Sequence, residues 1–516
     1  MHDVVPHAGR PCRAEVLAAL SVSIDLGLGQ PAEHMLRSAA IACRLADRLD
    51  LPDEQRGVVY YTTLVMWIGC HADSQEYARW FGDDIAVRDA AYRVDWAGLP
   101  YMTFLLRNVV RGQSPIHRAA TIAQLFSDAR GQLAQLLHSH CASAAALAAH
   151  LGLSTGVQNA VAFTFERYDG GGLPTGCSGT AIPIEMRIAQ LADVAEVHHR
   201  LYGIDGATAM VRSRRGGQFD PAIADVFGAD PEAILDEPDG DDPWSAAIRL
   251  APDGDTPVSD AELDALVTAI GDFADLKCPF MLGHSRGVAE LAESAGAIAG
   301  LTTVECSTLR RAGHLHDIGR LGVSNQVWSK PGALSAADWE RARMHPYFGA
   351  RVVSRIPGMA AEETLIRTHH ERVDGTGYPF KAGAAALGRP QRLLAAAVAY
   401  QSGTEPRPYR DALTPLEALD RMNDRVRQGH LDPDAVAAVA SAAGHRHAKP
   451  ALPAGLTPRE AEILTLAARG LSNKQIASEL TLSEKTVRNH IEHTYAKVGV
   501  NNRVGASLYA LGHGMA

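Results

Sequence analysis

Apolar residues recur at helical spacing along most of this chain. In the first large segment Leu36, Ala40, Cys43 and Ala46 follow one another three or four positions apart, which places them on one face of a helix. The alternation of apolar and polar positions that is typical of half-buried strands is scarce. We therefore predict a mostly α fold.

Residues 456–516 contain three short helical patterns in tandem. The capping box Thr457-Pro458-Arg459-Glu460 begins the first pattern, and Ser472 and Ser483 are placed to cap the next two. On the third helix the apolar side holds Val487, Ile491, Tyr495 and Val498, and the polar side holds Lys485, Arg488, Asn489 and Glu492. This separation predicts a small helical domain whose third helix presents hydrogen-bonding side chains.

The length of 516 residues favours three domains, and each of the two large segments is long enough to form a core. Residues 230–242 hold seven acidic and no basic side chains, with prolines between them. Charge repulsion and proline favour an extended conformation there. We expect domains at residues 1–228, 263–445 and 456–516, joined by an acidic linker at 229–262 and a hinge at 446–455.

The seven cysteines are scattered without CxxC spacing, which is typical of a reducing compartment. The N-terminus lacks the apolar core of a signal peptide, and polar residues interrupt the uncharged stretch 131–165. We expect a cytoplasmic protein with no contact to a membrane. Because the net charge is −10, any contact with nucleic acid has to be local.

Two pairs of adjacent polar residues, His316-Asp317 and His369-His370, indicate metal-binding chemistry. Neighbouring residues of a helix point about 100° apart, so neither pair can place both members in one apolar stripe. Imidazoles and a carboxylate that converge are ligands for a divalent transition metal such as Fe, Mn or Zn. The chain has 22 histidines, and for most of them a surface or hydrogen-bonded core position is the simpler interpretation.

The order and spacing of these residues over about 263–445 resemble the HD-GYP branch of the HD phosphohydrolase superfamily. Its members are all-α metal enzymes that split cyclic di-GMP and related phosphodiesters. The matching ligand positions are His284, His316, Asp317, His345, His369 and His370. The matching signature-loop positions are Asp374, Gly375, Gly377, Tyr378, Pro379, Arg407 and Arg410.

The resemblance implies that Asp317 bridges two metals and takes part in catalysis with Arg320. It assigns His345, His369 and His370 to one metal, and His284 and His316 to the other. A water held between two cations loses a proton near neutral pH and attacks phosphorus, so that no side-chain nucleophile is needed.

Three positions depart from the family pattern. Val398 stands where the family has its last ligand, an Asp, and an apolar side chain cannot ligate. Arg320 replaces a Lys, and Phe280 excludes the Glu that some members use for a third metal. We therefore expect about one metal per chain, and the departures put hydrolysis in more doubt than metal binding.

A second, degenerate copy of the domain precedes the first match. At a constant offset of 205 residues, His140, Glu166, Arg167, Asp169, Gly170, Gly172, Pro174 and Arg187 match His345, Glu371, Arg372, Asp374, Gly375, Gly377, Pro379 and Arg392. Thr164 and Phe165 replace the double histidine, and Asp193 aligns with Val398. We align His34 with His284 and, across a six-residue gap, Asp73 with Asp317. The few remaining ligand-type residues predict a domain for sensing, pairing or support.

The C-terminal segment resembles the LuxR-type helix-turn-helix almost throughout, from Leu456 through the helix that begins after Ser483. The resemblance implies that this helix enters the major groove of double-stranded DNA. Its expected DNA-contacting residues are Lys485, Thr486, Arg488, Asn489, Glu492 and Lys497, the last near a phosphate. It also implies a homodimer on DNA, formed through the helix at about 502–513.

Two functions of different class remain open. The first is a transcriptional regulator whose tandem HD-type domains sense a metal, a nucleotide or another ligand. The second is a metal-dependent phosphodiesterase for a cyclic dinucleotide such as cyclic di-GMP, with DNA binding as targeting. We favour the first, because the helix-turn-helix is nearly complete while the metal site has lost a ligand.

Overall fold

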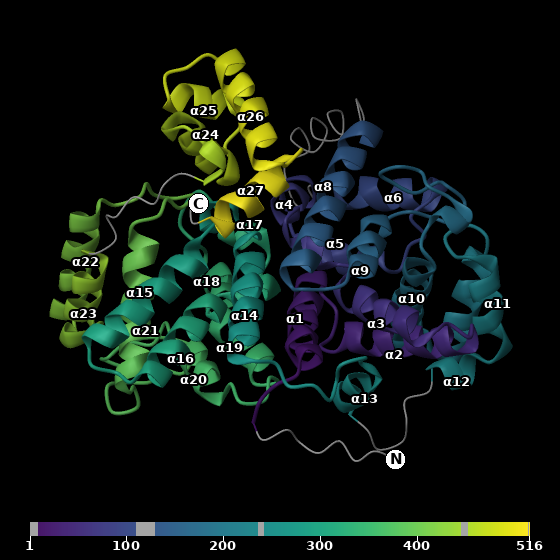
Figure 1. Ribbon diagram of the computed structural model, residues 1–516, viewed down its shortest axis with the longest axis horizontal. Coiled ribbons are helices and arrows are strands. Elements are labelled where there is room, and N and C mark those ends of the chain that lie inside the picture. Colours follow the sequence, from purple (N-terminus) through teal and green to yellow (C-terminus); the bar gives the residue numbers. More distant parts are fainter. Residues whose placement is uncertain (1–8, 110–128, 236–241, 445–452, 514, 516) are drawn as a thin grey trace. The chain divides into compact units, whose positions relative to one another are not determined.

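The computed structural model describes residues 9–109, 129–235, 242–444, 453–513 and 515. Every named element in these residues is a helix, which confirms the predicted mostly α fold (Figure 1). Within the described residues, no helix combines the length and apolar character needed to cross a membrane.

The chain divides into two compact units. The first comprises Met1–Leu263 with two short segments, Ser324–Gln326 and Arg355–Pro357. Its helices are α1 (Arg13–Leu28), α2 (His34–Arg48), α3 (Asp53–Val65), η1 (Ile68–His71), α4 (Ser74–Phe81), α5 (Asp84–Ala91), α6 (Gly98–Asn108), α8 (Ala129–His150), α9 (Thr155–Ala160), η2 (Val161–Phe163), η3 (Gly179–Ala181), α10 (Ile184–Arg214), α11 (Pro221–Ala229), α12 (Pro231–Leu235) and α13 (Pro243–Leu250).

The core of the first unit forms where α2, α3 and α10 pack together (Figure 1). Ile41, Leu45, Val59 and Leu191 are fully or almost fully buried in this core. A bend in α10 occurs at Gly203, whose φ of 69° lies in the left-handed region that favours glycine.

The acidic stretch 230–242 differs from the extended linker that we expected. Residues 231–235 form α12, and Asp242 caps α13 through its contact with the Trp244 N–H. Ile234 and Leu235 are buried in the core of the first unit. The expectation failed because burial of these two apolar residues outweighs the repulsion between their acidic neighbours. The remaining residues, 236–241, lie outside the described part of the chain.

The second unit comprises Asp264–Val323, Val327–Ser354 and Gly358–Ala516. Its larger part contains α14 (Asp260–Asp275), η4 (Pro279–Met281), α15 (His284–Ile298), α16 (Thr303–Leu315), η5 (Ile318–Gly322), α17 (Asn325–Trp328), α18 (Ala336–Ala342), α19 (His345–Val353), α20 (Ala360–Thr368), α21 (Arg389–Gly403), α22 (Pro415–Arg427) and α23 (Pro433–Ala443), although the first residues of α14 and α17 fall in the first unit. Helix α15 packs against α16, α21 and α23.

The C-terminal helices are η6 (Pro453–Gly455), α24 (Pro458–Ala468), α25 (Asn473–Glu479), α26 (Glu484–Val498) and α27 (Arg503–Gly512). Thr457, Ser472 and Ser483 each accept a hydrogen bond from the first turn of the helix that they precede, so the three predicted caps are confirmed. Ile463, Ile476 and Val487 form the centre of this small core.

The helix boundaries reveal how the two copies correspond. Helices α2 and α3 precede α15 and α16 by 250 residues, and η1 precedes η5 by the same offset. Helices α9 and α10 precede α20 and α21 by 205 residues, which is the offset read from the sequence. The offset changes because the first copy has a longer connection, with α4, α5 and α6, between η1 and α8.

Candidate metal centre

The six predicted metal ligands come together in the second copy, each at the end of a helix. His284 is the first residue of α15, after Gly283, whose φ of 80° turns the chain. His316 and Asp317 join α16 to η5, His345 begins α19, and His369 and His370 follow α20. His370 is half-buried, and the other five are buried.

Asp317 lies between two groups of imidazoles. Its Oδ2 atom is 3.2 Å from His316 Nε2 and 3.6 Å from His284 Nε2. Its Oδ1 atom is 3.4 Å from His345 Nε2 and 3.9 Å from His369 Nε2. In each of two groups, His284 with His316 and Asp317, and His345 with His369 and His370, the possible ligand atoms lie within 4.8 Å of one another. The carboxylate is therefore placed to face both groups.

Backbone carbonyls fix the orientation of three of these rings. The Nδ1 atoms of His316, His345 and His369 lie 2.8, 2.6 and 2.6 Å from the carbonyl oxygens of the residues three positions earlier. A carbonyl only accepts, so each Nδ1 carries the proton and each Nε2 presents a lone pair to the centre. The Nε2 atoms of His284 and His316 and the Oδ1 atom of Asp317 are buried without a hydrogen-bond partner. Such atoms fit a bound cation.

The charge states also suit a metal. Burial lowers the pKa of His345 to about 4 and the pKa values of His369 and His370 well below their usual range. Burial opposes ionisation of Asp317, but the neighbouring guanidinium of Arg320 outweighs it and holds the pKa of Asp317 well below its usual range. Neutral imidazoles around an ionised carboxylate need to lose no proton before they bind a cation.

Arg320 lies against the carboxylate that we expected it to assist. Its Nε atom is 2.8 Å from Asp317 Oδ2, and its guanidinium lies 4.6 Å from the centre of the Trp328 ring. Arg320 therefore contributes positive charge on the side of Asp317 that also faces His284 and His316.

Sequence reasoning missed Glu405. Its Oε2 atom accepts a hydrogen bond from His284 Nδ1 at 2.7 Å, and Gln401 Nε2 donates to its Oε1 atom at 2.7 Å. Burial raises the cost of its charge, but His284 and Arg407 outweigh burial and lower the pKa of Glu405 to about 2. The signal that could have revealed it is its position two residues before Arg407, in the second signature.

The first copy shows what a carboxylate does at the position of Val398. There Asp193 Oδ1 lies 3.0 Å from His34 Nε2, the counterpart of His284 Nε2. Val398 is buried and offers no oxygen. The group of His284 and His316 thus lacks the carboxylate that this helix position supplies in the first copy.

The signature loop positions an aromatic ring beside the histidines. Asp374 accepts hydrogen bonds from the backbone and hydroxyl of Thr376, and a side chain at Gly377 would overlap the backbone of Glu371 and Arg372. The Tyr378 ring stacks on His370, with centroids 4.8 Å apart. The loop, completed by Gly375 and Pro379, therefore forms one wall of the centre.

A cationic cavity of about 300 Å³ adjoins His345, His369 and His370. Its guanidinium groups belong to Arg320, Arg372, Arg407, Arg410, Arg421 and Arg425. Among the described residues, the ion pairs of these six arginines are those of Arg320 with Asp317 and of Arg407 with Glu405. Burial, and then the neighbouring Arg421 and Arg372, lower the pKa of Arg425. This excess of positive charge suits an anionic ligand.

Among the described residues, the two groups that could hold a metal both lie in the second copy, and one of our alignments of the first copy was wrong. Because η1 and η5 share the 250-residue offset, the residue at the position of Asp317 is Trp67, not Asp73, and Met66 stands at the position of His316. Trp67 Nε1 donates a hydrogen bond to Asp193 Oδ2 at 3.1 Å. Asp73 instead contacts His140 Nδ1 at 3.2 Å. Sequence identity around η1 is too low to place a gap in the alignment. The helix boundaries align the two copies in this region without a gap.

Helix α26 has the two faces that the sequence predicts. Val487 is fully buried, whereas Lys485, Arg488, Asn489 and Glu492 are exposed and Thr486 is half-buried. Lys497 differs, because its Nζ atom forms an ion pair with Glu460 at 2.7 Å and contacts the Gly455 carbonyl at 3.3 Å. The structure thus gives Lys497 an intramolecular partner where we expected a phosphate.

Comparisons with known proteins agree with this architecture. Residues 124–223 and 269–435 match the HD domain family, and residues 454–510 match the bacterial regulatory proteins of the luxR family. The chain is 28% identical over 437 residues to 3'3'-cGAMP-specific phosphodiesterase 3 of Vibrio cholerae, covering 83% of this chain and 94% of that protein.

A solved structure and a regulator complete the comparison. The crystal structure of a cyclic GMP-AMP specific phosphodiesterase from V. cholerae superposes with a TM-score of 0.58 at 26% identity, covering 87% of this chain and all of that one. Over 58 residues, 11% of this chain and 24% of the relative, the sequence is 53% identical to a probable HTH-type transcriptional regulator, GfsR, of Streptomyces halstedii. The chain belongs to the HD domain family and ends in a LuxR-type regulatory domain.

Proposed function

We propose that this protein is a LuxR-type DNA-binding regulator whose second HD copy binds a metal and an anionic phosphodiester ligand. The observation that carries the proposal is the cationic cavity beside His345, His369 and His370 in a chain that also presents the exposed polar face of α26. If a ligand bound in the cavity regulates DNA binding through α26, it should alter the affinity of the protein for DNA, and this affinity can be measured directly.

The proposed ligand is a cyclic dinucleotide. Guanidinium groups bind phosphate oxygens through paired charge-assisted hydrogen bonds, and Arg421 and Arg425 have no carboxylate partner among the described residues. Glu371 is the one acidic side chain that lines the cavity, and it accepts hydrogen bonds from the backbone of Phe380 and Ala382. The curated relatives that are named for cyclic GMP-AMP and cyclic di-GMP support this ligand class.

Asp317, His345, His369 and His370 would hold one divalent transition metal such as Fe, Mn or Zn. A bound metal of this kind acts as a Lewis acid toward a phosphoryl oxygen. Arg320 neutralises part of the charge on Asp317, and Tyr378 keeps water away from one face of His370. We propose one metal per chain because Val398 leaves the group of His284 and His316 without its helix-borne carboxylate.

The alternative is hydrolysis of the same ligand, with DNA binding as targeting. The observation that favours it is the convergence of His284, His316 and Asp317, whose ligand atoms lie within 4.8 Å of one another despite the loss at position 398. A second metal held by these three residues would restore a two-metal centre. Turnover therefore distinguishes an enzyme from a receptor.

The test uses the full chain and DNA that it selects from a random library. Binding of labelled DNA is measured by anisotropy with and without 3'3'-cyclic GMP-AMP or cyclic di-GMP, and the nucleotide is analysed by chromatography afterwards. A change in DNA affinity with intact nucleotide supports the regulator, whereas linear product at many turnovers supports the alternative. If neither nucleotide changes the affinity for DNA and neither is hydrolysed, the proposed ligand class is wrong.

A matched pair of variants locates the ligand. Arg421→Gln removes a guanidinium that lines the cavity, whereas Arg427→Gln changes an exposed arginine of the same helix, α22, that pairs with Asp424. We expect only the first to weaken nucleotide binding, by about tenfold or more. Equal effects would show that the nucleotide binds elsewhere. Homodimerisation through α27 and reading of two half-sites are part of the same proposal.

A further inference from the structure

The long connection of the first copy builds an apolar wall. Helices α4, α5 and α6 lie in this connection, between η1 and α8. Phe81, Val87 and Val109 form a small core of their own, and Tyr77, Trp80, Phe104 and Leu105 pack against it. The wall therefore consists largely of aromatic side chains.

This wall encloses a cavity of about 550 Å³ at the position that the metal centre occupies in the second copy. Trp67 and Phe165, which replace a metal-binding Asp and His of the other copy, line it together with Trp80, Trp96, Tyr101 and Phe104. The volume and the apolar lining are those of a pocket for a small organic molecule.

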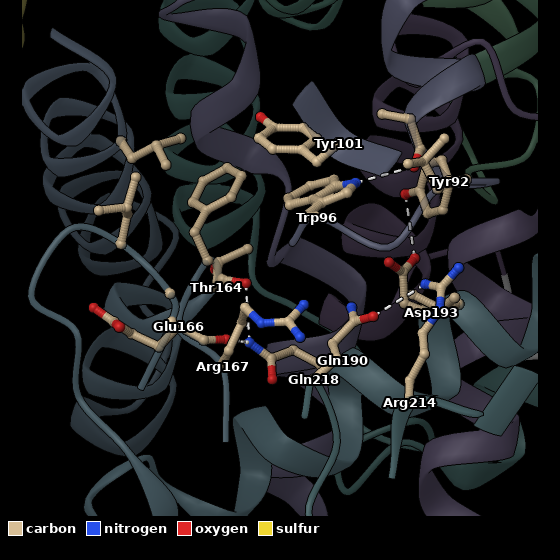
Figure 2. Close-up of a pocket in the computed structure, with 18 of the residues that line it drawn as sticks. Tyr92, Trp96, Tyr101, Thr164, Glu166, Arg167, Gln190, Asp193, Arg214 and Gln218 are labelled. Carbon is tan, nitrogen blue, oxygen red and sulfur yellow. Dashed lines mark hydrogen bonds between the residues drawn. The ribbon is translucent and has the colours of Figure 1, made fainter. Parts of the chain in front are cut away.

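A second, smaller cavity of about 70 Å³, which polar side chains help to line, shares Trp67, Trp96 and Tyr101 with the first. Figure 2 shows Trp96 and Tyr101 at one side of it, and Arg167, Gln218 and Arg214 toward the other. Because the two cavities have these lining residues in common, they are adjacent, and Arg167, Gln218 and Arg214 line the smaller one.

Arg214 carries a buried positive charge without a carboxylate partner among the described residues. Its side chain is 8% exposed, and its Nη1 atom donates a hydrogen bond to the amide oxygen of Gln218 at 3.0 Å. Arg167, by contrast, pairs with Asp95 and Asp169. Burial lowers the pKa of Arg214; the negative charge of Asp95, which is itself paired with Arg167, opposes this only in part, and the positive charge of Arg167 adds to the lowering. An unpaired buried charge is costly, and an anion bound beside it offsets that cost.

The two acidic side chains of the same cavity are already engaged. Asp193 accepts hydrogen bonds from Trp67 and Tyr92 and lies against the ring of His34. Glu166 accepts hydrogen bonds from the backbone and hydroxyl of Thr175, as its counterpart Glu371 does from the backbone of Phe380. Neither is placed to neutralise Arg214.

We infer that the first copy binds a small organic anion, with a flat apolar body between Trp80, Trp96 and Phe165 and a single carboxylate- or sulfonate-like group at Arg214. The inference deepens the proposed regulator by giving its sensor a second, chemically different ligand. Binding is measured without DNA or nucleotide, so its failure is distinguishable from failure of the proposed function.

The test compares two fluorescent probes of the same shape on the full chain. They are 1-anilinonaphthalene-8-sulfonate, which is anionic, and N-phenyl-1-naphthylamine, which is uncharged. Arg214→Met should weaken binding of the sulfonate about tenfold or more and leave the uncharged probe unaffected. Replacement of an unpaired buried charge by an apolar side chain of similar length is compatible with folding, which circular dichroism verifies.

Two controls fix the location. Arg212→Met changes an exposed arginine of the same helix and should alter neither probe. Energy transfer from tryptophan to the bound sulfonate should fall in Trp96→Phe and persist in Trp328→Phe, since Trp328 lines the cavity of the second copy. Arg214→Lys, which keeps the charge, should retain the preference for the anion.

Three results would overturn the inference. The first is an equal loss of binding affinity for both probes in a folded Arg214→Met variant. The second is equal affinity for the sulfonate in the Arg212→Met and Arg214→Met variants. The third is energy transfer that depends on Trp328 but not on Trp96. Should Arg214→Met fail to fold, the Arg214→Lys and Trp96→Phe results decide the question by the same criteria.

Discussion

Glu405 contacts His284, but its position in the chain differs from that of the carboxylate that makes the corresponding contact in the first copy. There, Glu196 Oε2 lies 2.6 Å from His34 Nδ1, and the residue at the position of Glu196 in the second copy is Gln401. The carboxylate on His284 comes instead from residue 405, and Gln401 donates a hydrogen bond to it. The contact to the imidazole is thus kept although the residue that supplies it has changed.

In a Val398→Asp background, which should restore the second metal site, Glu405→Gln should weaken binding of that second metal at His284. A carboxylate on Nδ1 fixes the protonated side of the ring and makes Nε2 a better ligand, and loss of such a partner costs roughly 10- to 100-fold in affinity. Metal competition with a chromophoric chelator measures the change, and Glu340→Gln, an exposed position in the same unit, is the control. Unchanged affinity for the second metal would mean that His284 does not bind it.

Val398→Asp should raise the metal content from about one to two per chain. The first copy supplies the template, since Asp193 at this position reaches the Nε2 atom of His34. Elemental analysis after saturation and dialysis gives the count. Two metals per chain in the unchanged protein would contradict the prediction and favour the phosphodiesterase.

The parts of the fold that local signals determine were predictable. Thr457, Ser472 and Ser483 cap helices because a hydroxyl at that point satisfies backbone N–H groups, wherever the helix packs. His316, Asp317, His369 and His370 could be recognised because no apolar stripe accommodates His-Asp and His-His pairs, whereas His284 and His345 followed from the family resemblance.

The parts that failed depend on contacts between distant segments. Glu405 reaches His284 across 121 positions, and its place two residues before Arg407 suggests a role in the site without indicating which residue it contacts. The correspondence of Trp67 with Asp317 became clear only when helix boundaries replaced identity as the guide, since a tryptophan shares no chemistry with the residue it replaces. The helix in the acidic stretch depends on the core that receives Ile234.

The first copy should lose stability in alkaline solution. Burial disfavours a charged His34, but Glu196 and Asp193 outweigh it and raise the pKa of His34 to about 10, above the value of about 6.5 for an unfolded chain. The stabilisation is therefore complete below about pH 6.5 and is lost as the pH rises through about 10. Urea unfolding of the full chain at pH 7 and pH 10 should show this loss.

His34→Asn should reduce that pH dependence, whereas His150→Asn, at an exposed position, should preserve it. The same dependence in all three proteins would assign the alkaline transition to other groups.

Lys497→Ala should destabilise the LuxR-type domain and leave the salt dependence of DNA binding unchanged. The ammonium of Lys497 is the largest cause that lowers the pKa of Glu460 to about 2, and it ties the end of α26 to the start of α24. A half-exposed pair of this kind contributes about 1 kcal/mol or less. Thermal unfolding and a salt titration separate the roles, because a phosphate contact would lower the salt slope by about one.

Arg488→Ala should cost roughly 1–3 kcal/mol of binding at particular base positions and relax specificity there. Arg488 is exposed on the face of α26 opposite the buried Val487, so its removal leaves the core of the domain intact. Guanidinium groups bind guanine edges in pairs of hydrogen bonds, and a lost pair affects only sequences that present that base. Arg469→Ala, exposed at the end of α24, is the control for a general loss of positive charge. If Arg488→Ala weakened selected and random DNA equally, as loss of a phosphate contact does, α26 would not be the helix that reads the groove.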